Sequence, residues 1–471
     1  MAETDLDLFI TGGTVVAPQG VAPANVGVRD GKIAVVCDPS VRLAARRTVD
    51  ATGRHVLPGV IDPHVHLRAR GQTVAEACRT ETPSMALGGV TTIFHFSQAL
   101  DSYLPVWEQE RAEVNENALI DVGFHSIVMT EQHIAELPLY AREFGVTTCK
   151  LYMAAQGKEM FPGTRSVNDG LLLQAFETIG QLSRGAYPRA LAMVHAENSE
   201  IAWALTERFK KEGRDGIAAW SEARPWYIYE EPMRRAIFYA RQHACPLYIV
   251  HCGIGSTRAL IAEARGVGDR VYAETCPLYL TYHYEHERAV EALNTPAVQG
   301  PQDLEGLWAG LLDGAISTVG SDHLPRRATD RDSTGKTIWT MRGGSNGSGT
   351  ILPVVLTYGH HQRGMSLERV VEVTSTNAAK LLGLFPRKGT IQVGADADLV
   401  IVDLEREVRL QPEMLQLDWV LHKDWDFKGW PVMTLVRGQV VAEDGQIVAE
   451  PGTGRYVRDA ASTAERAGAL G

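Results

Sequence analysis

The chain has 471 residues, of which 45% are hydrophobic, and its formal net charge is −11. This length and apolar content allow a large buried core, and the negative charge argues against nucleic acid or an anionic membrane surface as the main partner. Because the chain opens with acidic residues and its six cysteines are scattered without a Cys-x-x-Cys spacing, we expect a reduced, cytoplasmic protein with no membrane span.

Short strands separated by glycine turns are predicted at both ends of the chain. Alternating apolar residues with Asp-Gly and Gly punctuation fill residues 7–50, and a similar pattern returns within 389–448. We expect the two ends, residues 1–58 and 384–457, to build one small β-sandwich together. Residues 458–471 are expected to form a surface tail.

Eight short apolar strands alternate with helix-length segments through residues 59–383. The predicted strands are Val60–His66, Thr91–Phe96, Asp121–Val128, Thr147–Tyr152, Ala190–His195, Leu247–His251, Val271–Glu274 and Ile316–Ser321. Helices are expected between them, for example at 199–212, 231–243 and 257–265. This α/β pattern predicts a (β/α)₈ TIM barrel, whose active site lies at the carboxyl ends of the strands.

Side chains that can bind metal ions stand at the carboxyl ends of these strands. His64 and His66 alternate on the first strand, so both imidazoles lie on one face. The other candidates are Lys150, His195, His251 and Asp322. Each residue alone is more easily explained by packing, or for Asp322 by a helix cap, but five strands of one barrel that contribute together predict a metal centre.

Lys150 needs its own explanation, because an ammonium group repels dications and cannot act as a ligand. A buried amine that stays neutral can capture CO₂ as a carbamate, which offers two anionic oxygens. We therefore predict N6-carboxylysine at this position, bridging two divalent ions. The remaining ligands divide into two sets, namely His64, His66 and Asp322 on one ion and His195 and His251 on the other.

A centre of this kind suits the hydrolysis of an amide-like bond. Two metal ions that share a hydroxide hold a nucleophile at neutral pH, and one of them can polarise the carbonyl under attack. Asp322 is the predicted catalytic residue, since it can accept the proton of the nucleophile and pass it to the departing nitrogen. Imidazole and carboxylate ligands suit Zn²⁺, with Mn²⁺ or Co²⁺ as alternatives.

With these residues in place, the chain resembles the cyclic amidohydrolases of the amidohydrolase superfamily, which include hydantoinases, dihydropyrimidinases, allantoinases and dihydroorotases. The likeness extends over nearly the whole chain, from residues 53–59 to residues 388–401. In that family a His-x-His pair, a carboxylated lysine, two further histidines and an aspartate hold the metals, and every position is filled here. The resemblance also implies a homo-oligomer, either a tetramer or a dimer.

One departure from the family pattern bears on the substrate. Dihydropyrimidinases and D-selective hydantoinases carry a tyrosine five residues after the bridging lysine, where this chain has Ala155. The pattern here is similar to that of L-selective or broad-range hydantoinases. Tyr152 is a candidate to supply the missing hydroxyl, and the alternative is that it packs in the core.

Three further residues are candidates for substrate contacts. Arg68 follows the His-x-His pair as in dihydroorotases, where the arginine receives the substrate carboxylate; the alternative is a cation that only orders its loop. Asn294 is the residue that position favours for the ring imide. Asn346, in a glycine-rich segment, is a second candidate, and a plain loop role is equally compatible with it.

We therefore predict an enzyme that opens a 5-substituted hydantoin, or a related cyclic ureide or imide, to the N-carbamoyl amino acid. Allantoinase, dihydropyrimidinase and dihydroorotase activities are alternatives on the same scaffold. A non-catalytic, dihydropyrimidinase-like scaffold protein would have lost the metal ligands, and a mononuclear deaminase would not need Lys150. Metal content separates these classes, at about zero, one or two ions per chain.

Overall fold

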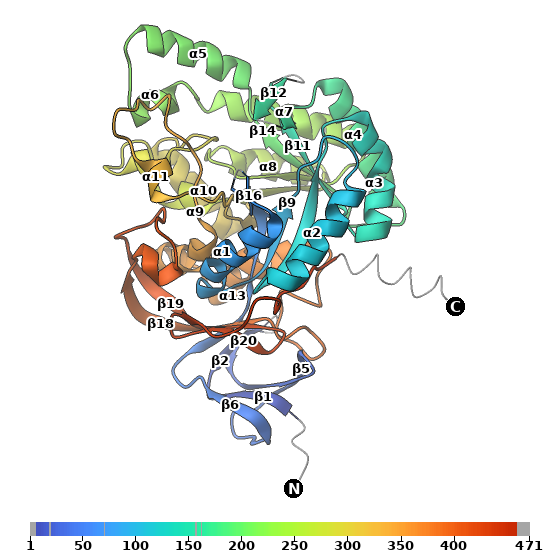
Figure 1. The fold of residues 1–471 in the computed structure, drawn as a ribbon, viewed down its shortest axis with the longest axis vertical. Helices are drawn as coiled ribbons and strands as arrows, with labels where there is room; N and C mark the ends of the chain where they lie inside the picture. Colours follow the sequence, from blue (N-terminus) through green and yellow to red (C-terminus); the bar gives the residue numbers. More distant parts are fainter. Residues whose placement is uncertain (1–5, 18–19, 70, 156–157, 162, 459–471) are drawn as a thin grey trace.

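The computed structural model describes residues 6–17, 20–69, 71–155, 158–161 and 163–458. A barrel surrounded by helices forms the larger part of the molecule, and strands from both ends of the chain lie beside one another below it (Figure 1). Apart from Arg458, the predicted tail lies outside the described residues.

Eight strands in sequential order form one parallel sheet, which confirms the predicted barrel. They are β8 (Val60–Val65), β9 (Val90–Phe96), β10 (Asp121–Ile127), β11 (Thr148–Met153), β14 (Leu191–Ala196), β15 (Leu247–Ile249), β16 (Val271–Thr275) and β17 (Thr318–Val319). Nearly all of their residues are buried, as expected for strands covered by helices on the outside and by side chains within.

The barrel closes just beyond the last strand. Val65 at the end of β8 forms a parallel bridge with His323, and the backbone N–H of His66 donates to the carbonyl of His323 at 2.7 Å. The end of the first strand is thereby fixed against the segment that follows the eighth. This closure brings the two ends of the predicted ligand set together.

Helices cover the outside of the barrel, and their ends follow the local sequence. Thr73 and Glu76 form a reciprocal capping box at the start of α1, while Gly145 ends α3 with φ 66°. The longer helices are α1 (Val74–Leu87), α2 (Leu104–Asn117), α3 (Glu131–Phe144), α4 (Asp169–Arg184), α5 (Ser199–Lys211), α7 (Tyr227–Gln242), α8 (Thr257–Gly266) and α10 (Pro301–Asp313). The shorter ones are α6 (Ile217–Glu222), α9 (Pro277–Thr281), α11 (Ala328–Arg331), α12 (Ile351–Val354), α13 (Leu367–Val371) and α14 (Asn377–Leu381).

Two sheets built from both chain ends form the smaller part. One has four strands in the order β5-β4-β1-β6, and the other has seven in the order β21-β20-β19-β18-β7-β2-β3. The strands are β1 (Leu6–Thr11), β2 (Thr14–Ala17), β3 (Gly20–Pro23), β4 (Asn25–Arg29), β5 (Lys32–Cys37), β6 (Ala45–Asp50), β7 (His55–Pro58), β18 (Leu399–Arg409), β19 (Asp426–Val436), β20 (Gln439–Glu443) and β21 (Gln446–Ile447).

The two ends of the chain share one core in this smaller part. β7 pairs in parallel with β2 and antiparallel with β18, and one apolar cluster joins residues of both ends, such as Ile10, Val26 and Leu399. These pairings support the predicted composite sandwich. We keep the boundaries at residues 58 and 384 as a proposal.

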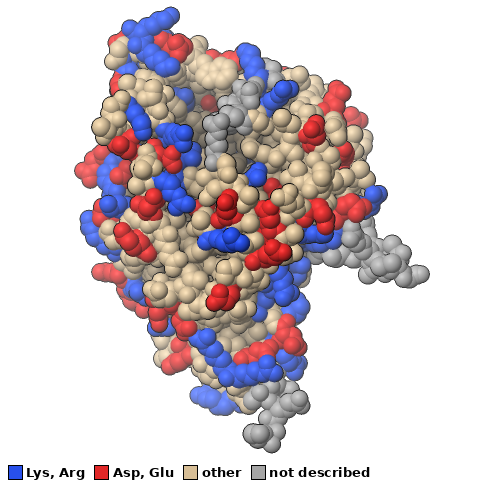
Figure 2. All heavy atoms as spheres, in the orientation of Figure 1, with Lys and Arg blue, Asp and Glu red and all other residues tan. Residues whose placement is uncertain are grey.

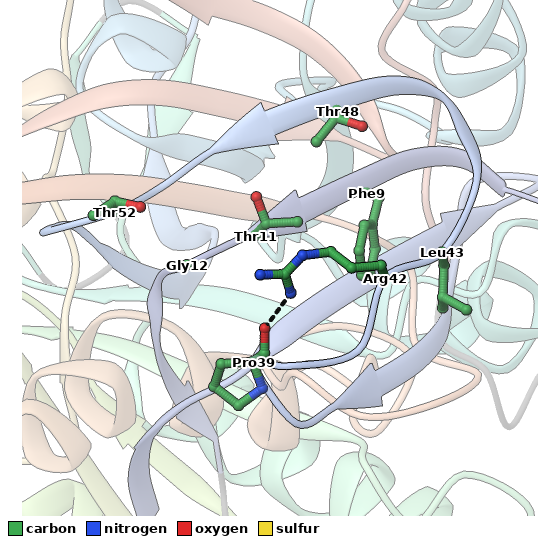
Figure 3. Close-up of a pocket in the computed structure, with 8 residues that line it drawn as sticks. All are labelled: Phe9, Thr11, Gly12, Pro39, Arg42, Leu43, Thr48 and Thr52. Carbon is green, nitrogen blue, oxygen red and sulfur yellow. Dashed lines mark hydrogen bonds between the residues drawn. The ribbon is translucent and has the colours of Figure 1, made fainter.

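The face in view carries lysine, arginine and carboxylate side chains interspersed with one another (Figure 2). Each helix in the described part of the chain is too short or too polar to cross a membrane. A hollow of about 310 Å³ opens in the sandwich, where Arg42 donates to the carbonyl of Pro39 (Figure 3). Threonines, Gly12 and apolar side chains complete its lining, and none of these described residues is a histidine, cysteine or carboxylate that could bind a metal ion.

Candidate metal centre and active site

His64, His66 and Asp322 form a compact cluster at the carboxyl end of the barrel. One ligand atom of each lies within 4.8 Å of the others. The Nε2 atoms of His64 and His66 are 3.2 Å and 3.4 Å from Oδ1 of Asp322. His64 is fully buried, whereas the side chain of His66 is 22% exposed. Two imidazoles and a carboxylate that converge in this way fit one divalent ion.

His195 and His251 form a second pair beside this cluster. Nδ1 of His195 lies 2.9 Å from Nε2 of His251, and Nε2 of His195 lies 3.1 Å from Oε2 of Glu197. If His195 donates its Nε2–H to Glu197, the lone pair of Nδ1 faces the other ring. Convergent imidazole nitrogens are the arrangement that two ligands of one cation adopt.

Lys150 is fully buried on β11, close to both groups. Its Nζ has no hydrogen-bond partner among the described residues, and it lies 5.0 Å from the ring centre of Phe96 and 5.2 Å from that of Tyr152. Burial lowers the pKa of Lys150 to about 8, against the opposing pull of Asp322 and Glu274. A neutral amine is the form that reacts with CO₂, so this environment suits the predicted carbamate.

Two of the candidate ligands stand on backbone that leaves the strand conformation. His251 has φ 43° and Asp322 has φ 49°, both in the left-handed region that non-glycine residues seldom adopt. Regular pairing ends at Ile249 and at Val319, so the predicted strands to His251 and Ser321 are too long. The turned backbone directs both side chains toward the centre, and such conformations cluster at functional sites.

Buried carboxylates hold these ligands in place, and sequence reasoning gave them no role. Glu274 lies 2.6 Å from Nδ1 of His64. Asp62 accepts hydrogen bonds from the backbone N–H of His64 and from the hydroxyls of Ser321 and Ser348. The sequence did show an acidic residue within an apolar barrel strand. Burying such a carboxylate costs free energy unless it has hydrogen-bond partners.

The electrostatics of the cluster follow from this crowding. Burial raises the pKa of Asp322, but His64 and His66 outweigh burial and hold it well below the usual range. Burial lowers the pKa of His66 against the influence of Asp322. The carboxylate is therefore charged and His66 is neutral near pH 7, which are the forms that bind a metal ion.

Asn294 and Tyr152 lie next to the predicted ligands. Nδ2 of Asn294 donates to Oδ2 of Asp322 at 3.4 Å, and the Tyr152 ring centre lies 5.4 Å from that of His195. Burial raises the pKa of the Tyr152 hydroxyl, so this group is protonated and able to donate. Ala155, five residues after Lys150, is completely buried.

Arg68 and Asn346 already have protein partners. Nη1 of Arg68 lies 3.8 Å from Oε1 of Glu110, and the arginine side chain is 31% exposed. Asn346 is buried and donates through Nδ2 to the carbonyl of Trp419, while its Oδ1 has no hydrogen-bond partner among the described residues. A substrate carboxylate at Arg68 would have to compete with Glu110.

The described residues fit two divalent ions. The cluster around Asp322 offers three ligand atoms, the pair of His195 and His251 offers two, and the unpartnered Lys150 amine lies near both sets. A carbamate on that amine would add an anionic ligand group close to both sets. The donor types, imidazole and carboxylate, suit Zn²⁺ and similar ions.

Comparison with known proteins finds relatives that cover nearly the whole chain. A family model described as "Amidohydrolase family" matches residues 55–441. An L-hydantoinase of Paenarthrobacter aurescens is 31% identical, covering 96% of this chain and 98% of the relative. An allantoinase of Deinococcus radiodurans is 34% identical, covering 96% of this chain and 99% of the relative.

Solved structures show the same fold. The L-hydantoinase (dihydropyrimidinase) from Arthrobacter aurescens superposes with a TM-score of 0.87 at 30% identity, over 96% of this chain and 100% of that one. A crystal structure of a D-hydantoinase gives a TM-score of 0.87 at 30% identity, over 96% of this chain and 99% of that one. These similarities include both the barrel and the sandwich.

Proposed function

Since the chain belongs to the amidohydrolase family and is a cyclic amidohydrolase, we propose that it opens a 5-substituted hydantoin, or a related cyclic ureide or imide, to the N-carbamoyl amino acid. Its relatives include L-hydantoinases, D-hydantoinases and allantoinases, and their substrates share a five-membered ring of this kind. The proposal extends this ring chemistry to the present chain.

The observation that carries the proposal is the buried, unpartnered amine of Lys150 beside two groups of convergent ligands. A lysine whose Nζ has no hydrogen-bond partner among the described residues is costly to bury. Its Nζ lies 5.0 Å from the ring centre of Phe96, which is 4.8 Å from that of His64, and 5.2 Å from the ring centre of Tyr152, which is 5.4 Å from that of His195. Addition of CO₂ to the neutral amine, with release of one proton, would form a carbamate, which removes the cost and supplies an anionic ligand group.

We propose two divalent ions per chain, Zn²⁺ in the first place and Mn²⁺ or Co²⁺ as alternatives. When bound, the ions would lower the pKa of a water molecule and polarise the carbonyl of the ring. His64, His66 and Asp322 would hold one of them and His195 and His251 the other, with carboxylated Lys150 in common.

Asp322 is the proposed general base and acid. Its carboxylate faces the Nε2 atoms of both His64 and His66 on one side and the amide of Asn294 on the other. In this position it can take a proton from the attacking water and deliver it to the ring nitrogen that leaves. Since its pKa is held low, it begins the reaction as a base.

Asn294 is the proposed contact for the ring imide, because its amide already lies within 3.4 Å of Asp322. Tyr152 can donate its hydroxyl toward the substrate carbonyl, in place of the tyrosine absent at Ala155. Oδ1 of Asn346, which has no hydrogen-bond partner among the described residues, is the proposed acceptor for a ring N–H. Arg68 is the proposed contact for an anionic ring substituent, in competition with Glu110.

Allantoinase activity is the second candidate, because the allantoinase relative is 34% identical and the ring of allantoin is itself a hydantoin. The pairing of Arg68 with Glu110 favours hydantoinase and allantoinase activity over dihydroorotase activity.

We also propose a homotetramer or homodimer. Large apolar side chains that are exposed on α5, directly before α7 and on α7, namely Trp203, Trp226 and Phe238, support an association surface.

A hydrolysis panel tests the proposal, with L- and D-5-substituted hydantoins, allantoin, dihydrouracil and dihydroorotate as substrates and the metal content measured on the same samples. We expect the highest kcat/KM for a 5-substituted hydantoin and about two ions per chain. Preference for allantoin would select the second candidate. Preference for dihydroorotate, or activity with a single ion, would overturn the proposal.

A further inference from the structure

Glu274 is a carboxylate sealed inside the barrel at the end of β16. Its side chain is 0% exposed, and within the described residues no lysine or arginine forms an ion pair with it. A buried carboxylate is tolerated only where hydrogen bonds replace its hydration. The groups that supply those hydrogen bonds therefore indicate what this residue does.

Two donors meet at one oxygen of Glu274. Oε1 lies 2.6 Å from Nδ1 of His64 and accepts the backbone N–H of His251 at 3.0 Å. The other oxygen, Oε2, accepts the hydroxyl of Tyr248 at 2.7 Å. One carboxylate oxygen thus holds a residue of each of the two proposed ligand sets.

Each contact fixes something that metal binding requires. The bond from Nδ1 of His64 leaves the lone pair on Nε2, the atom that faces Asp322. The bond from the backbone of His251 stabilises its left-handed conformation at φ 43°, which directs that ring toward His195. Loss of the carboxylate would release both ligands at once.

The neighbouring strand is built around the same carboxylate. A Cβ atom on Gly320 would lie 2.4 Å from Oε2 of Glu274 and 2.6 Å from its Cδ, well inside van der Waals contact. Only glycine fits while the carboxylate keeps its place. Gly320 directly follows β17 and lies two residues before Asp322. The end of the eighth strand therefore leaves room for Glu274 next to the ligand that this segment supplies.

We propose that Glu274 is a positioning residue that couples the two metal sites, so that both ions are bound and lost together. This inference rests on the proposed binuclear function and adds a specific role within it. Residues that hydrogen-bond to metal-binding histidines commonly change metal affinity by about 10- to 100-fold when they are removed. Here the change should fall on both ions, because His64 and His251 belong to different sets.

Two substitutions of Glu274 separate the effect of its charge from the effect of its side-chain length. Glu274→Gln keeps the length of the side chain but removes the negative charge, and Glu274→Asp keeps the charge but shortens the side chain by one methylene. Purified holoenzymes are equilibrated with graded concentrations of a chelator, and retained zinc is counted per chain. The absorption spectrum of the Co²⁺-loaded protein reports the ligand geometry, and circular dichroism reports folding.

We expect wild type to retain two ions and both variants to lose the pair in one step, at about 10- to 100-fold lower chelator concentration, with an altered Co²⁺ spectrum. Tyr248→Phe is the matched control, since it removes the hydrogen bonds of that hydroxyl to Oε2 and to Thr318 but leaves both contacts at Oε1, and it should shift the midpoint by less than about tenfold. If a folded variant retained both ions as wild type does, or lost only one, the coupling role would be overturned. A wild type with fewer than two ions would instead contradict the proposed binuclear function.

Discussion

The proposed ligands and the proposed substrate contacts of this protein are held in different ways. The metal floor, defined as His64, His66, Lys150, His195, His251 and Asp322, is buried or nearly so, and its histidines are tied to carboxylates such as Glu274 and Glu197. In the substrate rim, defined as Arg68, Tyr152, Asn294 and Asn346, two residues make long contacts to carboxylates. Arg68 lies 3.8 Å from Glu110, and Asn294 lies 3.4 Å from Asp322.

This difference separates the reaction class, which the floor determines, from the choice of substrate, which the rim determines. Ligands at the ends of barrel strands are positioned by the strands themselves and by buried hydrogen bonds, whereas ring recognition depends on loops that follow the strands. We therefore expect changes in the floor to abolish turnover for every substrate. Changes in the rim should alter the ranking of substrates by much smaller factors.

Asp322→Asn should have the largest effect. The amide keeps one oxygen to serve as a ligand but cannot carry a proton between the nucleophile and the leaving nitrogen. We expect kcat to fall by roughly 10³-fold or more, while KM for the best hydantoin stays within about threefold. Steady-state kinetics together with metal analysis test this, and substantial turnover by a variant with full metal content would exclude the role of Asp322 as proton carrier.

Lys150→Ala should come next. Without the amine no carbamate forms, so metal content should drop below two and activity should fall by at least about 100-fold. Short carboxylic acids such as propionate should restore part of both, because they can occupy the bridging position. Lys150→Arg is the matched control, since it keeps a cation that cannot form the carbamate. Full metal content and activity of Lys150→Ala without added acid would refute the proposed bridge.

Arg68→Met should have only a small effect on a neutral hydantoin. Because Arg68 faces Glu110, its loss removes a partner of that carboxylate, whose pKa burial already raises. We expect kcat/KM for a 5-alkyl hydantoin to change by less than about tenfold. Combining it with Glu110→Gln should recover any loss. If the single variant lost 100-fold or more on dihydroorotate but not on the hydantoin, Arg68 would be a carboxylate receptor.

The floor could be predicted from the sequence because its information is local. Short apolar runs locate the barrel strands, and histidine, lysine and aspartate at their ends are uncommon enough to stand out. Strand order and barrel closure then follow from general rules of α/β topology. That these residues bind metal, and which ion each of them binds, stay predictions.

What the sequence did not predict depends on contacts between distant segments. The left-handed backbone of His251 relies on Glu274 in the next strand, and that of Asp322 follows a ladder that ends at Val319. The pairing of Arg68 with Glu110 joins the first strand end to α2. Sequence periodicity does not predict contacts between such distant residues. The partners of the rim residues therefore could not be predicted as the positions of the floor residues were.

His422 lies outside both the floor and the rim, and its substitution should have the smallest effect on the protein. Its Nε2 is 3.0 Å from the hydroxyl oxygen of Thr281, which itself donates to the carbonyl of Pro277. Its Nδ1 has no partner among the described residues, so a second proton there would be buried without an acceptor. Burial accordingly lowers the pKa of His422 to about 3, with Arg288 adding to the effect.

A histidine kept neutral in the folded state makes stability depend on pH. The unfolded chain binds a proton below about pH 6.5 and the folded chain does not, so the free energy of unfolding falls by about 1.4 kcal/mol per pH unit as pH decreases from 6.5 toward 3. His422→Gln should remove this contribution and flatten the slope by up to that amount between pH 6 and 4. Denaturant titrations at several pH values measure the slope, and at pH 7 to 8 both proteins should show the same one. An unchanged slope in acid would mean that His422 gains its proton while the protein is folded. Turnover at pH 8 should be the same in both proteins, because His422 contacts neither the floor nor the rim.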